Sequence, residues 1–140
     1  MDKHNLSDCI VLAAEDAMIN RGILSQMLLD TGISIEYAEN GRTALEMFSK
    51  NPEKYDIILM DINMPGMNGL EGTRKIRALG GRGKDIPIIA MTANVNSKDI
   101  EKHIAAGMNS HIGKPVNRVE LVQLLNEYID MDRKRENYPS

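Results

Sequence analysis

Short apolar runs alternate along the chain with longer segments whose apolar residues recur every three or four positions. The apolar runs predict strands at residues 9–14, 33–38, 55–60, 86–91 and 110–113. The first, third and fourth runs show no alternation with polar residues. Both faces of these strands are therefore expected to be covered, as in a parallel sheet.

The segments between these runs have the period of amphipathic helices. In the first segment, Ile19, Ile23 and Met27 form an apolar stripe at i, i+4 spacing, accompanied by Leu24 and Leu28. Such a stripe is typical of a helix face that packs on a core. Similar patterns predict four more helices, marked by Ala44, Leu45 and Phe48, by Leu70, Thr73, Ile76 and Leu79, by Ile100 and Ile104 after a cap at Ser97, and by Val119, Val122, Leu125 and Ile129.

Five strands and five helices in strict alternation predict right-handed crossovers and a parallel sheet with helices on both faces. The chain contains no internal repeat, linker or low-complexity segment. The pattern therefore predicts one doubly wound α/β domain at residues 9–130. Flexible tails are expected at residues 1–8 and 131–140.

Composition narrows the class of protein without changing the predicted fold. The chain has 140 residues, of which 42% are apolar and 26% charged, as in ordinary soluble domains with a real core. A net charge of -3 gives no reason to expect nucleic acid or an anionic membrane as a partner. The single cysteine excludes an intrachain disulfide, and no apolar run approaches the roughly 20 residues of a membrane span. We therefore expect a cytoplasmic protein.

Chemically active side chains follow the strands at the edge where open α/β sheets form their sites. The first strand runs into Glu15 and Asp16, and the third is followed by Asp61. The fourth strand is followed by Thr92, and the fifth by Lys114. Neighbouring strands would bring three carboxylates, a hydroxyl and an ammonium together at one edge.

Three carboxylates in one pocket repel one another, which favours either retained protons or a bound divalent cation. A hard cation such as Mg²⁺ takes a few protein oxygens and leaves room for phosphate oxygens. With the metal bound, Asp61 can act as a carboxylate nucleophile toward phosphorus. Thr92 and Lys114 would then help to neutralise the oxygens of the transferring group. Asp61 is thus the predicted phosphoacceptor.

Five motifs of this chain occur together in one protein family. They are "VLAAED", "DIILMDINMPGMNGLEGTRKIR", "IPIIAMTAN", "AAGMNSHIGKPV" and the closing helix. With them, roughly residues 9–128 closely resemble a response-regulator receiver domain of two-component signalling. The acidic pair and the segment after the acceptor look most like the receivers of hybrid sensor histidine kinases.

The resemblance implies the strand order 2-1-3-4-5 and dependence on Mg²⁺. It also implies a phosphoryl group taken from the phosphohistidine of a histidine kinase or histidine phosphotransfer protein, self-dephosphorylation, and signal relay to a partner. Carried over position by position, Asp61 is the acceptor and a metal ligand. Asp16 and the main-chain carbonyl of Asn63 match direct metal ligands, and Glu15 matches a position that contacts the metal through water.

The resemblance also assigns the phosphate-contacting and switch positions. Thr92 and Lys114 match the pair that contacts the phosphoryl group. His111 stands three residues before the lysine, where relatives usually carry tyrosine or phenylalanine, and so alters the aromatic switch that works with Thr92. Asn68 stands where many relatives have aspartate, and we interpret this difference as a detail of the loop.

Three other functions are compatible with parts of the pattern. A phosphatase of the haloacid-dehalogenase type also uses an aspartate nucleophile, but it requires a second aspartate where this chain has Asn63. A flavodoxin-like cofactor carrier needs a first loop that binds phosphate, whereas the acidic loop at residues 13–18 would repel it. The third is a degenerate receiver that serves only as a docking module, although every acceptor-site position is filled.

Overall fold

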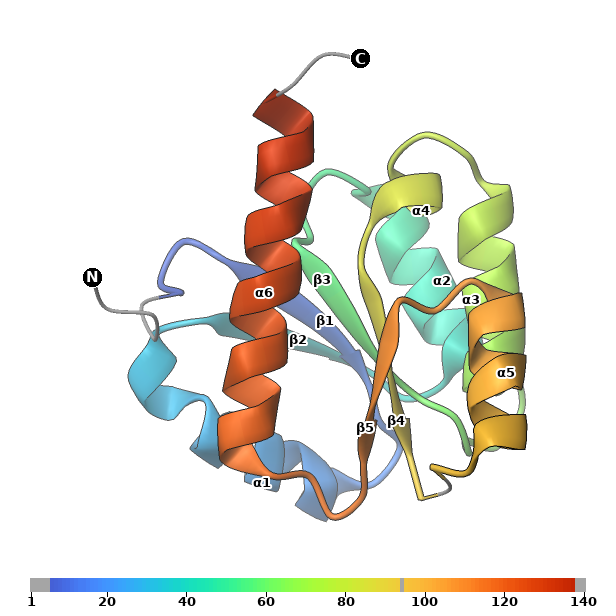
Figure 1. Cartoon of the computed structure of the whole chain (residues 1–140), viewed down its shortest axis with the longest axis horizontal. Coiled ribbons are helices and arrows are strands. Elements are labelled where there is room, and N and C mark those ends of the chain that lie inside the picture. Colours follow the sequence, from blue (N-terminus) through green and yellow to red (C-terminus); the bar gives the residue numbers. More distant parts are fainter. Residues whose placement is uncertain (1–5, 94, 138–140) are drawn as a thin grey trace.

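Five parallel strands form one sheet in the computed structural model, which describes residues 6–93 and 95–137 (Figure 1). The strand order is β2-β1-β3-β4-β5, and all four pairings are parallel. The strands are β1 (Ile10–Ala14), β2 (Ser34–Ala38), β3 (Ile57–Asp61), β4 (Ile88–Thr92) and β5 (Ser110–Gly113). The predicted fold class and strand order are confirmed.

Helices cover both faces of the sheet, and an apolar core lies on each face (Figure 1). One core contains side chains of α1 and α6, and the other contains side chains of α2 and α3. The helices are α1 (Met18–Met27), α2 (Gly41–Lys50), α3 (Gly69–Ala78), α4 (Arg82–Asp85), α5 (Ser97–Ala106) and α6 (Arg118–Asn137), with a short 3₁₀ helix, η1 (Leu29–Thr31). None of the described helices is both long and apolar enough to cross a bilayer.

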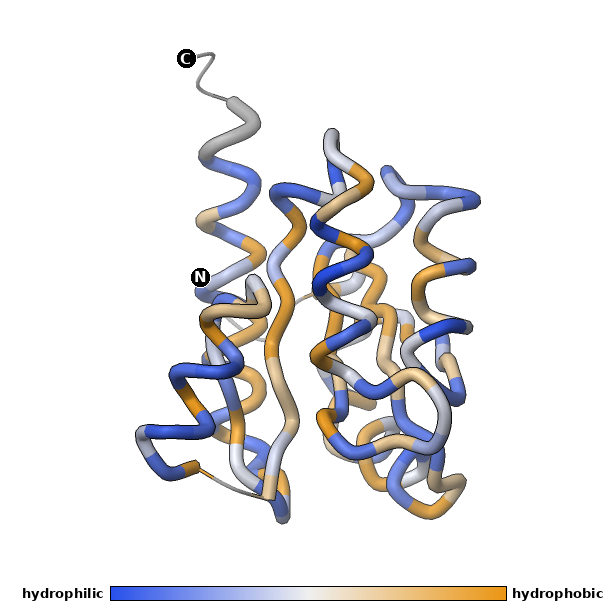
Figure 2. The backbone as a smooth tube through the Cα atoms, turned by 90° about the vertical axis from the view of Figure 1, so that its right-hand side faces the viewer, coloured by the Kyte–Doolittle hydropathy of each residue, from blue (hydrophilic) through white to orange (hydrophobic). Residues whose placement is uncertain are grey.

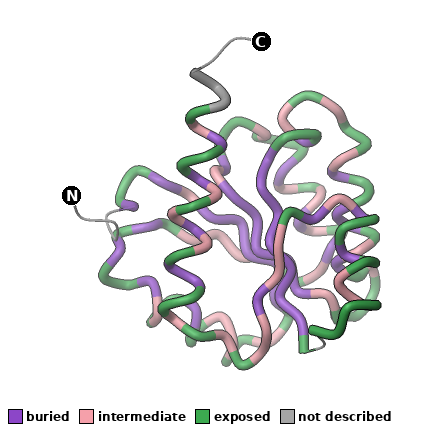
Figure 3. The backbone as a smooth tube through the Cα atoms, viewed as in Figure 1, coloured by how far each residue is buried: buried purple, intermediate pink, exposed green. Residues whose placement is uncertain are grey.

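The central strands are buried on both faces, as their lack of alternation predicts. Every residue of β3 and β4 is buried, and Figure 3 shows exposed residues mainly on the outer sides of the helices and in loops. Figure 2 shows the same separation as apolar strands beside helices of mixed hydropathy. The fully buried part of the sheet therefore ends at the carboxyl ends of the strands, where the polar side chains begin.

Asparagine side chains cap the N-termini of four of the described helices. The side chains of Asn40, Asn68, Asn96 and Asn117 each accept a hydrogen bond from the backbone amide of the third residue of α2, α3, α5 and α6. The predicted cap at Ser97 is therefore wrong by one residue, since Asn96 makes the bond. Asn68 caps α3, and because asparagine and aspartate cap helices about equally well, the difference from the usual aspartate leaves this loop intact.

Only part of the predicted apolar stripe of α1 faces the core: Leu24 and Leu28 lie in it and Met27 packs against it, whereas Ile19 and Ile23 do not. Ile19 is 76% exposed and Ile23 46% exposed, whereas Leu24 and Leu28 are 3% and 1% exposed. A helix of ten residues at one side of the sheet buries only one narrow face, and Leu24 and Leu28 lie on that face. The isoleucines are left as an apolar surface on α1.

The folded part of the chain extends into both predicted tails. Leu6 is buried, and its amide donates to the carbonyl of Thr31 at 2.7 Å. Helix α6 continues to Asn137, although a flexible tail is predicted from residue 131. Buried Asp132 accepts a hydrogen bond from Arg82 Nη1 at 2.8 Å, which ties the second half of α6 to α4. The rest of the predicted tails, residues 1–5 and 138–140, lies outside the described residues.

Candidate functional site

Three carboxylates gather at the carboxyl edge of the sheet. Because β1 and β3 pair in register, with Ala14 opposite Met60, the residues that follow them are neighbours. Oxygen atoms of Glu15, Asp16 and Asp61 all lie within 4.8 Å of one another. Glu15 and Asp61 are each 2% exposed, and Asp16 is exposed to solvent.

Both oxygens of Asp61 are held by hydrogen bonds. Lys114 Nζ donates to Oδ2 at 2.7 Å, and the backbone amide of Asn63 donates to Oδ1 at 3.1 Å. The same ammonium lies 3.6 Å from a carboxylate oxygen of Glu15. A buried carboxylate is costly without such partners, so Lys114 makes the burial of this pair possible.

Thr92 ends β4 beside the acidic cluster. It is 2% exposed and follows Met91, which pairs with Asp61. Its carbonyl accepts the amide of Lys114 at 2.9 Å, so the sheet itself fixes the distance between these two residues along their backbones. The predicted acceptor, hydroxyl and ammonium residues therefore come from adjacent strand ends.

His111 lies deeper in the sheet than these residues. It pairs with Ala90, two residues before Thr92, and is half-buried. Alternate residues of a strand point to the same face, so His111 faces the side on which Thr92 lies. The structure thus places His111 next to the β4 segment that leads to the site, and outside the acidic cluster.

The donor set fits a hard divalent cation. Three carboxylates and one ammonium leave the cluster with a net negative charge, and carboxylate oxygens are the ligands that Mg²⁺ and similar cations prefer. Asp16 keeps the cluster open to solvent, which suits a cation that retains several waters. Asn63 lies beside Asp61 through its amide, and the metal contact of its carbonyl stays a prediction.

Sequence reasoning missed Arg21, which supports the acidic loop from α1. Its Nε donates to the carbonyl of Glu15 at 2.7 Å, and its guanidinium lies 5.5 Å from the centre of the Tyr37 ring. The Tyr37 hydroxyl in turn donates to the carbonyl of Arg21 at 2.8 Å. Nothing in the local pattern marks this arginine, because both of its partners come from other elements.

Gly69 allows α3 to start directly against the acceptor strand. A Cβ atom at this position would collide with the carbonyl oxygen of Asp61, and the Gly69 amide donates to the carbonyl of Ile62 at 3.2 Å. The turn after Asp61 is therefore packed onto the strand that carries the carboxylate. This contact restricts the backbone of Asp61.

Comparison with known proteins identifies the family. The profile of the response regulator receiver domain matches residues 11–126. The chain is 37% identical over 131 residues to hybrid signal transduction histidine kinase I of Dictyostelium discoideum, which covers 88% of this chain. It spans only 8 to 17% of the length of the curated relatives that it matches, so it corresponds to one region of much longer proteins.

Two solved structures share the fold over nearly their whole length. The receiver domain of the sensor histidine kinase PA1611 from Pseudomonas aeruginosa has a magnesium ion coordinated in its active-site cleft. It is 36% identical, with a TM-score of 0.77 over 87% of this chain and 98% of that one. The receiver domain of Ssk1 from Saccharomyces cerevisiae was crystallised with the histidine phosphotransfer protein Ypd1. It is 28% identical, with a TM-score of 0.82 over 89% of this chain and 90% of that one.

The family profile covers most of the chain, and the strand order is that of a flavodoxin-like sheet. Relatives above 30% identity include regions of hybrid sensor histidine kinases. With the acidic triad and the lysine held together at the strand ends, this chain belongs to the response regulator receiver domains.

Proposed function

We propose that this receiver domain is the phosphoacceptor of a two-component phosphorelay, with Asp61 as the acceptor. The observation that carries the proposal is the Asp61 carboxylate itself, which is buried and held at both oxygens within one cluster with Glu15 and Asp16. A carboxylate oriented in this way can attack phosphorus without first being ordered.

The reaction transfers a phosphoryl group from a histidine of the donor to Asp61. A carboxylate oxygen of Asp61 forms the new O–P bond while the P–N bond to the donor imidazole breaks, and the imidazole nitrogen keeps the electron pair. The Asn63 amide holds Oδ1, and the Lys114 ammonium, already bound to Oδ2, balances the charge of the arriving phosphoryl oxygens together with the Thr92 hydroxyl. Attack of water on the acyl phosphate later releases phosphate and restores the carboxylate.

The metal in this proposal is Mg²⁺. Asp16, Asp61 and the carbonyl of Asn63 would hold it, with Glu15 contacting it through water, and it would supply positive charge to the phosphoryl oxygens. The magnesium ion in the cleft of the PA1611 receiver domain supports this choice of cation.

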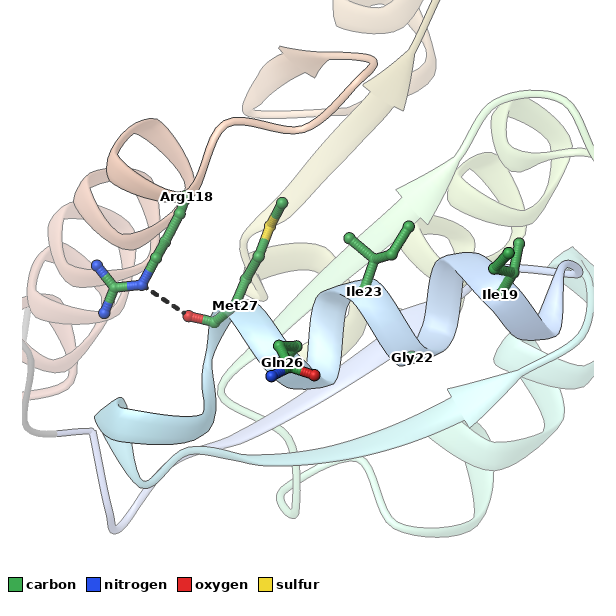
Figure 4. A pocket seen from close by; sticks show the side chains of 6 residues that line it. All are labelled: Ile19, Gly22, Ile23, Gln26, Met27 and Arg118. Atoms are coloured by element: carbon green, nitrogen blue, oxygen red, sulfur yellow. Dashed lines mark hydrogen bonds between the residues drawn. The ribbon is translucent and has the colours of Figure 1, made fainter.

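The apolar surface of α1 suits a protein donor of the phosphoryl group. Met18 and Ile19 are 77% and 76% exposed, and they follow Asp16 by only two and three residues. Figure 4 shows Ile19, Ile23 and Met27 on one side of α1, with Arg118 of α6 beside Met27. We propose that a histidine kinase or histidine phosphotransfer protein docks on this surface, and the Ypd1 complex of a related receiver domain supports that class of partner.

The test of this function is intact-mass measurement after incubation with acetyl phosphate and Mg²⁺. We expect a gain of one phosphoryl group that a chelator abolishes, because the small donor needs only the acceptor and the cation. A phosphatase of substrates in solution would release phosphate without a stable acyl phosphate, and a docking module without acceptor chemistry would gain no mass. Either result would contradict the proposal.

Replacing Ile19 by Glu should separate docking from chemistry. The charge removes apolar contact with a protein donor, so we expect transfer from phosphorylated Ypd1 to slow by about tenfold or more. Labelling by acetyl phosphate should not change. The matched control is Ile104→Glu on α5, where the isoleucine is also exposed, at 63%. If both variants slow the transfer equally, α1 is not the docking surface.

A further inference from the structure

A buried histidine on α5 lies outside the acidic site. The side chain of His103 is 4% exposed, and its Nδ1 atom is buried with no hydrogen-bond partner among the described residues. Burial without a hydrogen-bond partner costs a neutral imidazole some free energy, but it costs an imidazolium far more, because the charged ring also loses its hydration. The packing of α5 in the structure therefore favours the neutral form of His103.

Helix α5 packs against α3. Helices α3 and α5 lie side by side, and they run in the same direction because each leads from one parallel strand to the next (Figure 1). Arg77 Nε donates to the carbonyl of Gly107 at 2.9 Å, so one turn earlier Thr73 lies level with His103. The buried Thr73 Oγ1 also lacks a partner among the described residues, and a hydroxyl offers no negative charge to an imidazolium.

The charged groups around His103 add to this preference. His111 on β5 would repel an imidazolium at His103, whereas the guanidinium of Arg77 on α3 is engaged with the carbonyl of Gly107. Asp99 on α5 itself is the acid, and its carboxylate already accepts from the Asn96 amide at 2.8 Å. The pKa of His103 is lowered from its ordinary value of 6.5, mainly by burial and next by His111, while Asp99 opposes the shift.

Along the sequence, α5 and β5 lie between Thr92 and Lys114, the two residues that contact the phosphoryl group in the proposed function. Thr92 precedes the loop that leads into α5, and Lys114 follows β5 directly. His111 pairs with Ala90, two residues before Thr92. A shift of α5 away from β5 would therefore change the support of the β4 end that carries the Thr92 hydroxyl.

We propose that His103 makes the packing of α5 sensitive to pH, so that the neutral imidazole keeps α5 against α3 and β5 and protonation releases it. The packed form loses stability as the pH falls below 6.5, where an exposed imidazole gains its proton, and the loss ends near the lowered pKa of the packed form. For each unit by which the pKa of His103 is lowered in the packed form, protonation can increase the population of the opened form by up to about tenfold. The link between this opening and the phosphorylated state rests on the proposed function of Asp61, whereas the opening itself does not.

Hydrogen exchange of the α5 amides at residues 98–106 tests the opening. In the whole chain without a phosphate mimic, we expect the opening constant to rise severalfold between about pH 7.5 and about pH 5.5, after correction for intrinsic exchange. His103→Gln should remove this rise, whereas His111→Gln, which removes only the smaller of the two causes that lower the pKa of His103, should reduce it without abolishing it. A flat profile in the wild type, a rise that persists in His103→Gln, or a rise that His111→Gln abolishes would overturn the proposal.

Two further measurements keep the test decisive. If His103→Gln does not fold, the titration of the His103 ring protons by NMR replaces it, and a pKa at or above 6.5 overturns the proposal.

A second series with beryllofluoride tests the link to the site, because a mimic bound at Asp61 should reduce the rise at low pH. If beryllofluoride binds but leaves the rise unchanged, the link is wrong. If it does not bind at all, the proposed function fails while the exchange result without the mimic still decides the role of His103.

Discussion

Asp61→Asn is expected to gain no phosphoryl group from acetyl phosphate at any Mg²⁺ concentration. The amide oxygen of asparagine carries no negative charge, so it cannot form the acyl phosphate, and the loss should exceed about a thousandfold. The variant should still fold, since Asn63 can donate to the amide oxygen as it does to Oδ1 of Asp61. Intact mass reports the gain, and peptide mapping of the wild type should place the hydroxylamine-sensitive phosphate at residue 61.

The matched control for this variant is Asp16→Asn. Asp16 belongs to the same acidic cluster but is exposed, whereas Asp61 is buried and held by Lys114. We expect Asp16→Asn to require on the order of tenfold more Mg²⁺ and to reach full labelling once the metal saturates. Labelling that persists in Asp61→Asn and disappears in Asp16→Asn would move the acceptor to Asp16.

The sheet and the site could be predicted because both depend on local features of the sequence. The unbroken apolar runs around Ile58 and Ile89 mark strands buried on both faces, and the edge where such strands end is shared by all of them. Glu15, Asp61 and Lys114 each follow a predicted strand, so they meet at this edge once their strands are neighbours. The strand order itself came from the family resemblance.

Features that depend on contacts between distant segments could not be predicted. Apolar residues lie on two adjacent faces of α1. Their helical spacing does not show whether Ile19 and Ile23 or Leu24 and Leu28 face the core. The last turns of α6 are strongly polar. They are connected to the rest of the domain by the buried ion pair between Asp132 and Arg82, which lies fifty residues away in the sequence. Neither partner stands out in the sequence, which explains why this segment was predicted as a flexible tail.

Lys114 has two opposing effects on the site, and one substitution should reveal both. In the structure, its ammonium is the cation that contacts the buried carboxylates of Asp61 and Glu15, at 2.7 Å and 3.6 Å. In the metal-free protein this contact balances their charge, and its loss in Lys114→Met should lower the free energy of unfolding by about 2 kcal/mol. With Mg²⁺ present, the difference should shrink, because the metal takes over the compensation.

Lys114→Met is therefore expected to bind Mg²⁺ more tightly and yet to accept the phosphoryl group more slowly. Two cations in one pocket repel by roughly 1 to 2 kcal/mol, so removing the ammonium should lower the Kd for Mg²⁺ by about tenfold. The same ammonium balances the charge of the transferring group, and its loss should slow phosphorylation by on the order of a hundredfold at saturating metal. Calorimetry gives the Kd and intact mass gives the rate, with Lys84→Met, which removes an exposed lysine of α4, as the control. A lysine with only a structural role would weaken both metal binding and phosphorylation together, whereas opposite changes identify Lys114 as the cation that serves the phosphoryl group.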